Sequence, residues 1–308
     1  MTATAPPQVT VVGSVNRDIA IRLPRLPRPG ETQSSCGVTA RIGGKGANQA
    51  VAAARLGART RWCGAVGEDG EEVLAALAAH GVDVSGAVRL PGTPTGTAWI
   101  FVDDAAENAI VLDAGANGLL APDHVPALAD GVVLLQHEVP DAVTARALAT
   151  ARASDAVTVL NPAPFRPLAT ATLESVDVLV VNGPELAGLA GSASVPATPD
   201  EARVLLAEVP GVEVVATLGA HGALIQRGRH VEHIPAPPVD AVETTGAGDT
   251  FCGALAAAMA GGSPLVEAAE YAVHAAALSV TGEGAQESMP DAAQVREFMT
   301  TGAVPAAP

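Results

Sequence analysis

The chain has 308 residues, of which 48% are hydrophobic and 16% are charged, and its formal net charge is −16. This length and composition exclude a disordered chain and allow one large core, so we expect a folded α/β protein. The acidic balance argues against a nucleic-acid partner, and every apolar stretch is broken before the roughly 20 residues that a membrane span requires.

The number and spacing of the cysteines indicate the cellular compartment. The three cysteines, Cys36, Cys63 and Cys252, are an odd number at wide spacing, and there is no C-x-x-C pair. This pattern is typical of proteins of the reducing cytoplasm and argues against a structural zinc site. We therefore expect a cytoplasmic protein without a membrane partner.

Short β-branched, apolar runs bounded by turn residues predict strands buried on both faces, as in a parallel sheet. These runs are Val9–Val12, Val132–Leu135, Val157–Leu160, Val178–Val181 and Val214–Ala216. Helical segments such as Glu71–His80, closed by Gly81, and Asp141–Arg152 lie between them. Strands that alternate with helices indicate an α/β fold with three α/β/α layers and a mostly parallel central sheet.

Two early segments interrupt this rhythm. Ile19–Ile42 and Thr95–Leu112 alternate apolar and polar residues, which is typical of antiparallel strands with one exposed face. We interpret residues 18–42 and 95–113 as a small antiparallel β lid within a single domain that spans 1–308. An exposed sheet face carrying Trp99 and Phe101 predicts a homodimer through the lid.

Small and polar residues follow every predicted parallel strand. The segments concerned are 13–18, 136–138, 161–164, 182–185 and 217–222. Ligands of open α/β sheets bind in the crevice where parallel strands end. We therefore expect the binding site along this edge of the sheet.

The segment Thr244–Phe251 reads Thr-Thr-Gly-Ala-Gly-Asp-Thr-Phe and precedes an Ala-rich helix predicted over Cys252–Ala260. A glycine turn that runs into a helix gathers backbone N–H groups at the positive end of the helix dipole, which makes an anion site. A carboxylate at Asp249 would repel that anion unless it accepts the proton of an attacking hydroxyl. A simple N-cap role for Asp249 is the alternative, and the local pattern does not decide between the two.

A second glycine loop, Gly43–Gly46, also opens a predicted helix. It places Lys45 and Asn48 in the first turn, where they could contact a polyhydroxylated ligand; a solvated loop is the alternative. Neither glycine loop has the G-x-x-x-x-G-K-[ST] phosphate signature. The dinucleotide fingerprint is missing too, because Phe251 stands where its third glycine belongs.

These two loops carry a family resemblance. Gly43–Ala54 and Thr245–Leu255 are similar to the N-terminal and C-terminal signatures of the ribokinase (PfkB) family of carbohydrate kinases. Further matches are Gly13–Asp18, Pro29–Thr32, Ala114–Asn117, Asn161–Pro164, Thr217–Gly219 and Gly284–Gln286. The resemblance implies a ribokinase-like fold and ATP-dependent phosphorylation of a small sugar, with D-ribose phosphorylated at O5 to ribose 5-phosphate.

The resemblance also implies a role for each matching residue. The sugar would be bound by Asn16, Asp18, Gly44, Lys45, Asn48 and Glu138. Asp249 would act as general base, and Gly246, Ala247 and Gly248 would form the anion hole. The residues that contact ATP would be Asn182, Glu185, Thr217, Gly219, Gly222 and Gly248. Glu185 would also help indirectly to place Mg²⁺.

A K⁺ site is implied as well, from Glu243, Thr245, Ser279, Gly282, Gly284 and Ser288. Glu243 stands where the family usually has Asp; it keeps the charge but adds a methylene, so the K⁺ requirement stays open. Near the implied adenine pocket, Val273 occupies a position where the family often has Asn or His, and His274 lies one place along.

Two rival functions remain. One is a related kinase of another small sugar or of a nucleoside, against which the set of sugar-binding residues favours a small free sugar. The other is a catalytically inactive sugar or nucleotide sensor, because a fold does not fix a function. The presence of Asp249 with its whole glycine loop argues against the sensor.

Overall fold

The computed structural model describes residues 8–105, 108–128, 131–209 and 211–305, so the ends of the expected 1–308 domain lie outside the described residues. Its largest sheet has eight strands in the order β14-β13-β12-β11-β10-β9-β1-β4. The strands are β1 (Gln8–Val12), β4 (Arg59–Cys63), β9 (Val132–Gln136), β10 (Val157–Asn161), β11 (Val178–Asn182), β12 (Glu213–Thr217), β13 (Ala223–Arg227) and β14 (His230–Ile234).

The pairs from β4 to β12 are all parallel, and β13 and β14 add an antiparallel hairpin at one edge. The five predicted strands are the central five, β1 and β9 to β12, which confirms them. The edge strands β4, β13 and β14 were not predicted. β4 and β14, at the two edges of the sheet, mix charged and apolar residues, whereas β13 is a short run that is buried except for its last residue, Arg227.

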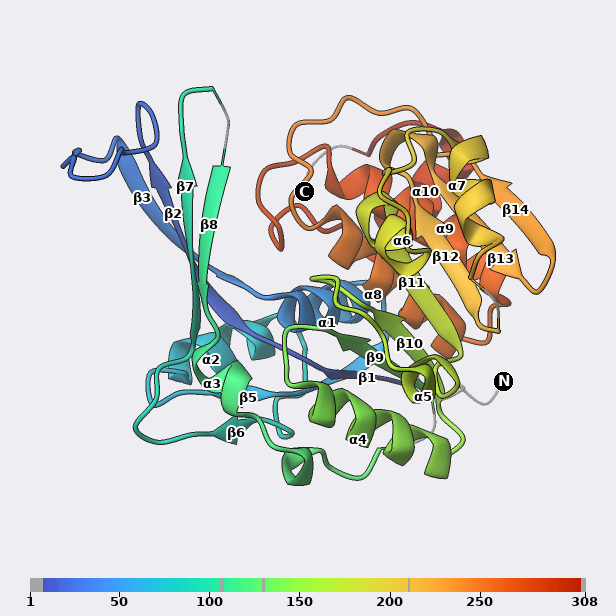
Figure 1. Cartoon of the computed structure of the whole chain (residues 1–308), viewed down its shortest axis with the longest axis horizontal. Helices are drawn as coiled ribbons and strands as arrows, with labels where there is room; N and C mark the ends of the chain where they lie inside the picture. Colours follow the sequence, from blue (N-terminus) through green and yellow to red (C-terminus); the bar gives the residue numbers. More distant parts are fainter. Residues whose placement is uncertain (1–7, 106–107, 129–130, 210, 306–308) are drawn as a thin grey trace.

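Helices cover both faces of this sheet (Figure 1). Successive strand residues point to opposite faces. Val11 and Leu134 join the core beneath α1, α8 and α9, while Val12 and Leu135 join the core beneath α4, α6 and α7. The three-layer prediction is confirmed. The helices are α1 (Lys45–Arg55), α2 (Glu71–Ala79), α3 (Gly115–Leu119), α4 (Asp141–Ala153), α5 (Thr170–Leu173), α6 (Gly183–Leu189), α7 (Pro199–Leu206), α8 (Ala247–Ala260), α9 (Leu265–Ser279) and α10 (Ala292–Thr301).

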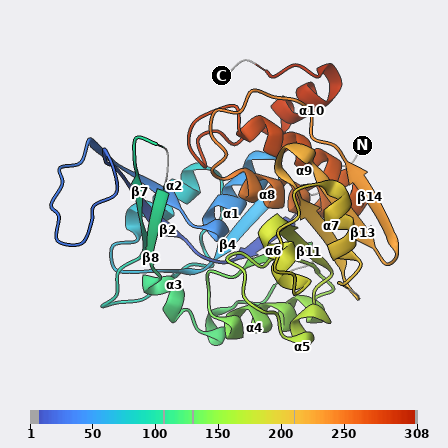
Figure 2. The same cartoon turned by 45° about the horizontal axis from the view of Figure 1, so that its top comes forward.

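A second sheet of four strands stands away from this body (Figures 1 and 2). Its order is β3-β2-β7-β8, and its strands are β2 (Asn16–Arg22), β3 (Gly37–Gly43), β7 (Gly96–Val102) and β8 (Asn108–Asp113). The outer pairs are antiparallel as expected, but the central pair, β2 with β7, is parallel. Both central strands therefore leave the body side by side. A two-stranded sheet, β5 (Ala65–Val66) with β6 (Val88–Arg89), lies near their base.

Within the described residues, no helix combines the length and the apolar character needed to cross a bilayer.

Candidate active site

The turn before α8 is shaped by a glycine. Gly246 is the N-cap residue with a φ of 80°, and a Cβ there would lie 2.9 Å from the Ala285 carbonyl oxygen. An L side chain would be strained at this φ, so the turn depends on glycine. The helix starts at Ala247, ahead of the predicted start at Cys252, because Gly248 lies within its first turn and does not precede it.

The first turn of α8 presents backbone N–H groups that the helix does not use. The Ala247 N–H donates to the Thr244 carbonyl at 3.2 Å, so it is less available than predicted. The N–H groups of Gly248 and Asp249 have no intrahelical partner at this position. A Cβ on Gly248 would meet no heavy atom within 4 Å, so its backbone is open to a ligand. These two groups, with the helix dipole, are suited to binding an anion, as predicted from the sequence.

Asp249 is buried in this turn, with 8% of its surface exposed. Its Oδ2 accepts a hydrogen bond from Asn48 Nδ2 at 2.9 Å, and its Oδ1 accepts one from Gln49 Nε2 at 3.0 Å. Both donors come from α1. The carboxylate therefore does not cap its own helix, and the N-cap alternative is wrong. It is aimed across the interface between α1 and α8.

A hydrogen-bonded chain of amides holds these two donors. Gln286 Nε2 donates to Asn48 Oδ1 at 2.8 Å, and Gln136 Nε2 donates to Gln49 Oε1 at 2.6 Å. Gln49 Nε2 also lies 3.2 Å from Asn161 Oδ1. The roles of Gln49, Gln136, Asn161 and Gln286 were not predicted. Gln49, Asn161 and Gln286 lie in the motif strings that carry the family resemblance, and Gln136 and Asn161 lie in segments that follow predicted strands.

Glu138 follows β9 and reaches the start of α1. Its Oε2 accepts from Ser14 Oγ at 2.5 Å and from the Lys45 backbone N–H at 2.9 Å. A carboxylate at a helix N-terminus is favourably placed in the helix dipole. Glu138 therefore joins the ends of β1 and β9 to the glycine loop that was predicted to close over the sugar.

Asn16 and Asp18 share one face of β2, two residues apart. Asn117 Nδ2 donates to Asn16 Oδ1 at 2.9 Å. Burial raises the pKa of Asp18 to about 7, with further contributions from the charges of Glu138 and Asp249. Asp18 Oδ1 is buried without a hydrogen-bond partner. An orphaned carboxylate oxygen beside two other carboxylates is a natural acceptor for ligand hydroxyls.

Gly43 and Gly44 let the glycine loop pass close to β2. A Cβ on Gly43 would collide with the Asp18 carboxylate, and a Cβ on Gly44, whose φ is 87°, would lie 2.8 Å from the Asn16 backbone nitrogen. The loop and the strand are thus in direct contact at the predicted sugar-binding residues.

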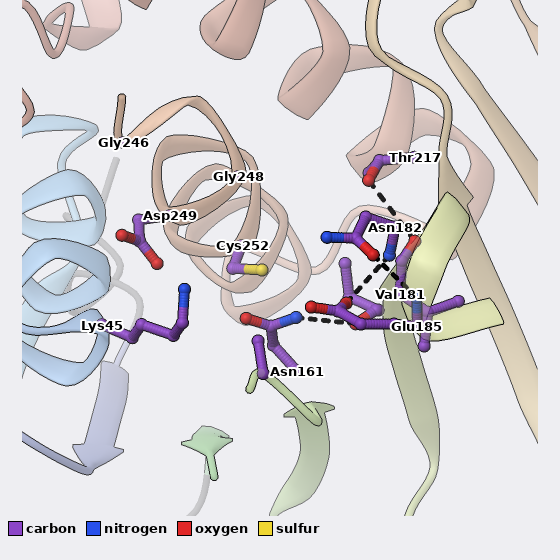
Figure 3. A pocket seen from close by; sticks show the side chains of 12 residues that line it. Lys45, Asn161, Val181, Asn182, Glu185, Thr217, Gly246, Gly248, Asp249 and Cys252 are labelled. Carbon is purple, nitrogen blue, oxygen red and sulfur yellow. Dashed lines mark hydrogen bonds between the residues drawn. The ribbon is translucent and has the colours of Figure 1, made fainter. Parts of the chain in front are cut away.

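A cavity of about 220 Å³ lies between α8 and the ends of β10 to β12 (Figure 3). Lys45, Asn182, Glu185, Gly248 and Asp249 are among the residues that line it. The Lys45 side chain reaches toward Asp249 in this space, so the structure places it with the residues predicted for ATP, whereas its backbone lies at the sugar side.

The cavity is lined by one ammonium, that of Lys45, and two carboxylates, those of Glu185 and Asp249. Burial alone would lower the pKa of Lys45, but the carboxylates of Asp249, Glu138 and Glu185 outweigh it and raise that pKa. Burial raises the pKa of Glu185, although the Asn182 N–H and Lys45 oppose it. Asn182 and Glu185 form a reciprocal cap at the start of α6, with both hydrogen bonds at 2.9 Å. A buried ammonium beside this anion site suits a phosphate ligand.

A larger, mainly apolar cavity of about 530 Å³ adjoins the first. Thr217 and Gly248 line both cavities, so the two lie side by side. The predicted nucleotide residues Gly219 and Gly222 line the second, together with Val273. His274 does not line it: its ring packs edge-on against Phe298, and its Nδ1 contacts the Glu270 carbonyl. The second cavity is large enough for a nucleoside.

Three of the residues predicted to bind a cation, Glu243, Gly282 and Ser288, lie close to Gly284 or to one another. Glu243 Oε2 accepts from the Gly284 N–H at 2.8 Å, and Ser288 Oγ donates to the Gly284 carbonyl at 2.6 Å. A Cβ on Gly282 would lie 3.1 Å from Ser288 Cβ. Ser279 ends α9 and donates to Ala276 within that helix.

Within the described part of the chain, no hydrogen bond joins Thr245 or Ser279 to the group around Gly284. The described residues hold no cluster of three or more His, Cys, Asp or Glu side chains suited to a metal ion. A cation at this loop would therefore be held mainly by carbonyl and hydroxyl oxygens beside Glu243.

An anion site lined by N–H groups, a buried carboxylate next to it, and an adjoining nucleoside-sized cavity form the arrangement of an enzyme that transfers a phosphoryl group to a hydroxyl. Comparison with known proteins agrees. The model of the pfkB family of carbohydrate kinases matches residues 6–292. The chain belongs to this family.

Individual relatives cover almost the whole chain. Ribokinase of Haemophilus influenzae is 36% identical over 94% of this chain and 98% of its own length. Deoxyribokinase of Salmonella typhi is 33% identical over 95% of this chain and 98% of its own length. Arabidopsis thaliana ribokinase, solved with ribose and ATP, superposes with a TM-score of 0.84 at 31% identity, over 96% of this chain and 99% of that one.

Proposed function

We propose that the protein phosphorylates D-ribose at O5 with ATP, giving ribose 5-phosphate and ADP. The observation that carries this proposal is the position of Asp249. Its carboxylate is held by Asn48 and Gln49, in the same turn as the unpartnered N–H groups of α8. Relatives that act on ribose, one of them solved with ribose and ATP, support the choice of acceptor and donor.

The residues suggest a direct in-line transfer. A sugar hydroxyl is a weak nucleophile at neutral pH, so Asp249 would accept the O5 proton as O5 attacks the γ-phosphorus. The bond to the β–γ bridging oxygen breaks, and ADP leaves with that electron pair. The N–H groups of Gly248 and Asp249 and the ammonium of Lys45 would stabilise charge on the phosphoryl oxygens.

Mg²⁺ bound with ATP would neutralise phosphate charge. The residues that fit this ion are Asn182 and Glu185. One oxygen of the Glu185 carboxylate is occupied by the cap of α6, and the side chain lines the phosphate cavity. Mg²⁺ prefers oxygen ligands and retains several waters, which suits an indirect role for Glu185.

The acceptor is tested by ADP release with Mg²⁺-ATP and a panel of D-ribose, 2-deoxy-D-ribose, hexoses and nucleosides. We expect ribose to give the highest kcat/KM. Deoxyribose is the informative rival, because a relative with 33% identity is a deoxyribokinase. Faster turnover of another sugar would keep Asp249 as base but change the substrate. Binding of sugar or ATP without any turnover would instead indicate a sensor.

We also propose that K⁺ activates the enzyme through the loop around Gly284. The proposed site consists of Glu243, Thr245, Ser279, Gly282, Gly284 and Ser288, and of these six Glu243 has the charged side chain. We expect K⁺ to raise kcat/KM by about fivefold or more relative to a large organic cation. Glu243→Gln should abolish this activation and leave the K⁺-free rate within about twofold. Equal activation of the parent and the variant, measured in matched chloride buffers, would contradict the assignment.

The small sheet exposes apolar side chains that a second copy could cover. Ile110 and Leu112 lie on the face that carries Asp18, and they are 60% and 48% exposed. Val38 and Val111 lie on the opposite face, and they are 59% and 56% exposed. We propose a homodimer through this sheet, which would act as a lid over the sugar. Light scattering should then give twice the chain mass for the parent and a monomer for Ile110→Glu. A monomeric parent would refute the dimer.

We place the reaction in the cytoplasm. All three cysteines are free, and Cys63 and Cys252 are buried. Free thiols in this number are usual in a reducing compartment, where ATP is also available.

A further inference from the structure

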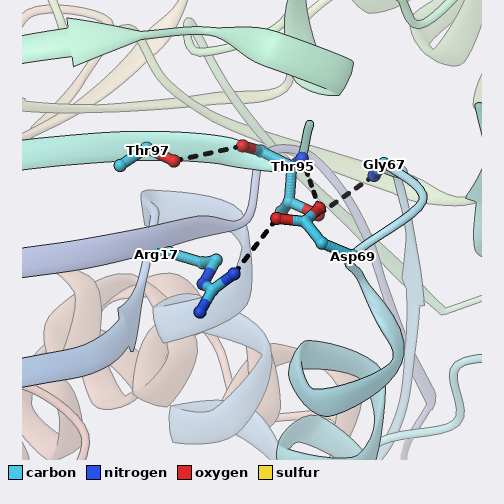
Figure 4. Close-up of polar contacts among 5 residues, drawn as sticks. All are labelled: Arg17, Gly67, Asp69, Thr95 and Thr97. Carbon is cyan, nitrogen blue, oxygen red and sulfur yellow. Dashed lines mark hydrogen bonds and ion pairs between the residues drawn. The ribbon is translucent and has the colours of Figure 1, made fainter. Parts of the chain in front are cut away.

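One carboxylate, that of Asp69, binds the bases of both central strands of the small sheet (Figure 4). Its Oδ1 accepts from the backbone N–H and from the hydroxyl of Thr95, each at 2.7 Å, immediately before β7 begins. Its Oδ2 accepts from Arg17 Nη1 at 3.1 Å, and Arg17 is the second residue of β2. Asp69 thus joins the two parallel strands at the point where they leave the body.

The segment that carries Asp69 belongs to the body, between β5 and α2. The Gly67 N–H donates to Thr95 Oγ1 at 3.0 Å, and the Glu68 N–H donates to the Thr93 carbonyl at 3.1 Å. A Cβ on Gly67 would lie 2.3 Å from the Pro94 carbonyl carbon, so the two backbones are in close contact. Thr95 is 1% exposed. The bases of the strands are therefore fixed to the body through buried contacts.

This attachment lies directly behind the sugar-binding residues. Side chains alternate along a strand, so Arg17 points away from the face that carries Asn16 and Asp18. A Cβ on Gly96, the residue after Thr95, would lie 2.5 Å from Asn16 Oδ1. A shift of Thr95 would therefore be transmitted to Asn16 through contacts that leave no spare space.

The two contacts of Asp69 differ in strength. Arg17 and Asp69 have side-chain exposures of 39% and 34%, so their ion pair alone contributes little. The bonds to Thr95 are shielded and are made to a charged acceptor, which strengthens them. Partial burial opposes ionisation of Asp69, but the hydrogen bonds from Thr95 and Arg17 hold the pKa of this carboxyl below its ordinary value.

We propose that Asp69 is a positioning residue: by binding Thr95 and Arg17 it fixes the base of the small sheet, so that Asn16 and Asp18 meet the acceptor in one geometry. Asp69 itself does not contact the substrate. This inference rests on the proposed function, because it assumes that β2 presents the acceptor-binding side chains.

The test compares the effect of each substitution on the KM for the acceptor with its effect on the KM for ATP. Asp69→Ala should raise the KM for the acceptor by about tenfold or more and leave the KM for ATP within about twofold. Asp69→Asn keeps one acceptor oxygen for Thr95 and should give a smaller increase. Glu71→Gln is the matched control, because it breaks the neighbouring surface ion pair with Arg89 and should change neither KM.

A second measurement does not depend on turnover. Hydrogen exchange of the backbone amides in β2 and β7 should be faster in Asp69→Ala than in the parent and the Glu71→Gln control. An unchanged acceptor KM, or an equal rise of both KM values with unchanged exchange, would overturn the proposal. The acceptor is whichever sugar the parent phosphorylates best, so a wrong choice of ribose does not affect this result. A parent without any kinase activity refutes the proposed function, whereas the exchange rates still report on Asp69.

Discussion

Asp249→Asn is expected to lower kcat by about 10²- to 10⁴-fold, which is the usual contribution of a positioned general base. The KM values for sugar and ATP should change little, because the amide has nearly the shape of the carboxylate. The Asn48 and Gln49 amides both donate to Asp249, so one of these two hydrogen bonds is lost or weakened in the variant. Steady-state kinetics and isothermal titration with each substrate measure the two effects separately.

The control for Asp249→Asn is Asp141→Asn. Asp141 also lies in the first turn of a helix, α4, but its side chain is 79% exposed and pairs with Arg166 on the surface. Its kcat should equal that of the parent. A kcat for Asp249→Asn within about tenfold of the parent would remove Asp249 from the role of base.

Asp18→Asn is expected to weaken sugar binding and at the same time to stabilise the fold. Ionised Asp18 can accept hydrogen bonds from sugar hydroxyls, and loss of such bonds to a charged group should raise the sugar KM by about 10- to 100-fold. The KM for ATP should stay close to that of the parent. In the parent, the sugar KM should fall as the pH rises through about 7, where Asp18 ionises.

The stability of the parent should show the opposite dependence on pH. The pKa of Asp18 is 3.8 in an ordinary setting and about 7 in the folded protein. The folded state therefore binds this proton more tightly than the unfolded state, so the contribution of Asp18 to stability is full below pH 3.8 and is lost as the pH rises through 7. Asp18→Asn removes the buried charge. Its melting temperature should exceed that of the parent at pH 8 by several degrees and match it at pH 4.

Differential scanning fluorimetry across this pH range decides the point. A gain in melting temperature that is equal at pH 4 and pH 8 would mean that ionisation of Asp18 does not destabilise the fold. The expected pattern is a conflict between function and stability, in which a binding residue is kept at a cost to the fold.

The fold was largely predictable because the signals for it are local. Strands such as Val132–Gln136 are apolar on both faces, and that run needs no partner to be recognised. The pairing direction of β2 and β7 was not predictable, because alternation along a strand says nothing about the direction of its neighbour. The start of α8 was placed too late, since the glycine at position 248 weakens the helical signal while the backbone is already helical.

The candidate site was predictable only in part, for a similar reason. Asp249 stood out because its glycine loop is contiguous in sequence. The amides that hold it come from segments far apart in the chain: Gln286 and Asn48 are 238 residues apart, and Gln136 and Gln49 are 87 apart. Nothing local marks such pairs. The free oxygen of Asp18 likewise depends on burial by neighbouring segments, which only the folded chain reveals.

Asn16 and Asp18 both lie on β2, a strand of the small sheet, whereas Asp249 and the larger apolar cavity belong to the main body. Part of the proposed acceptor site, Asn16 and Asp18, therefore lies on a structural unit separate from the proposed phosphate site. Evolution or laboratory selection can then exchange the acceptor by altering one short strand and its neighbours, with the chemical machinery left as it is. A small mutant library at residues 16–22 and 96–102 is the first one to screen for new acceptor preferences.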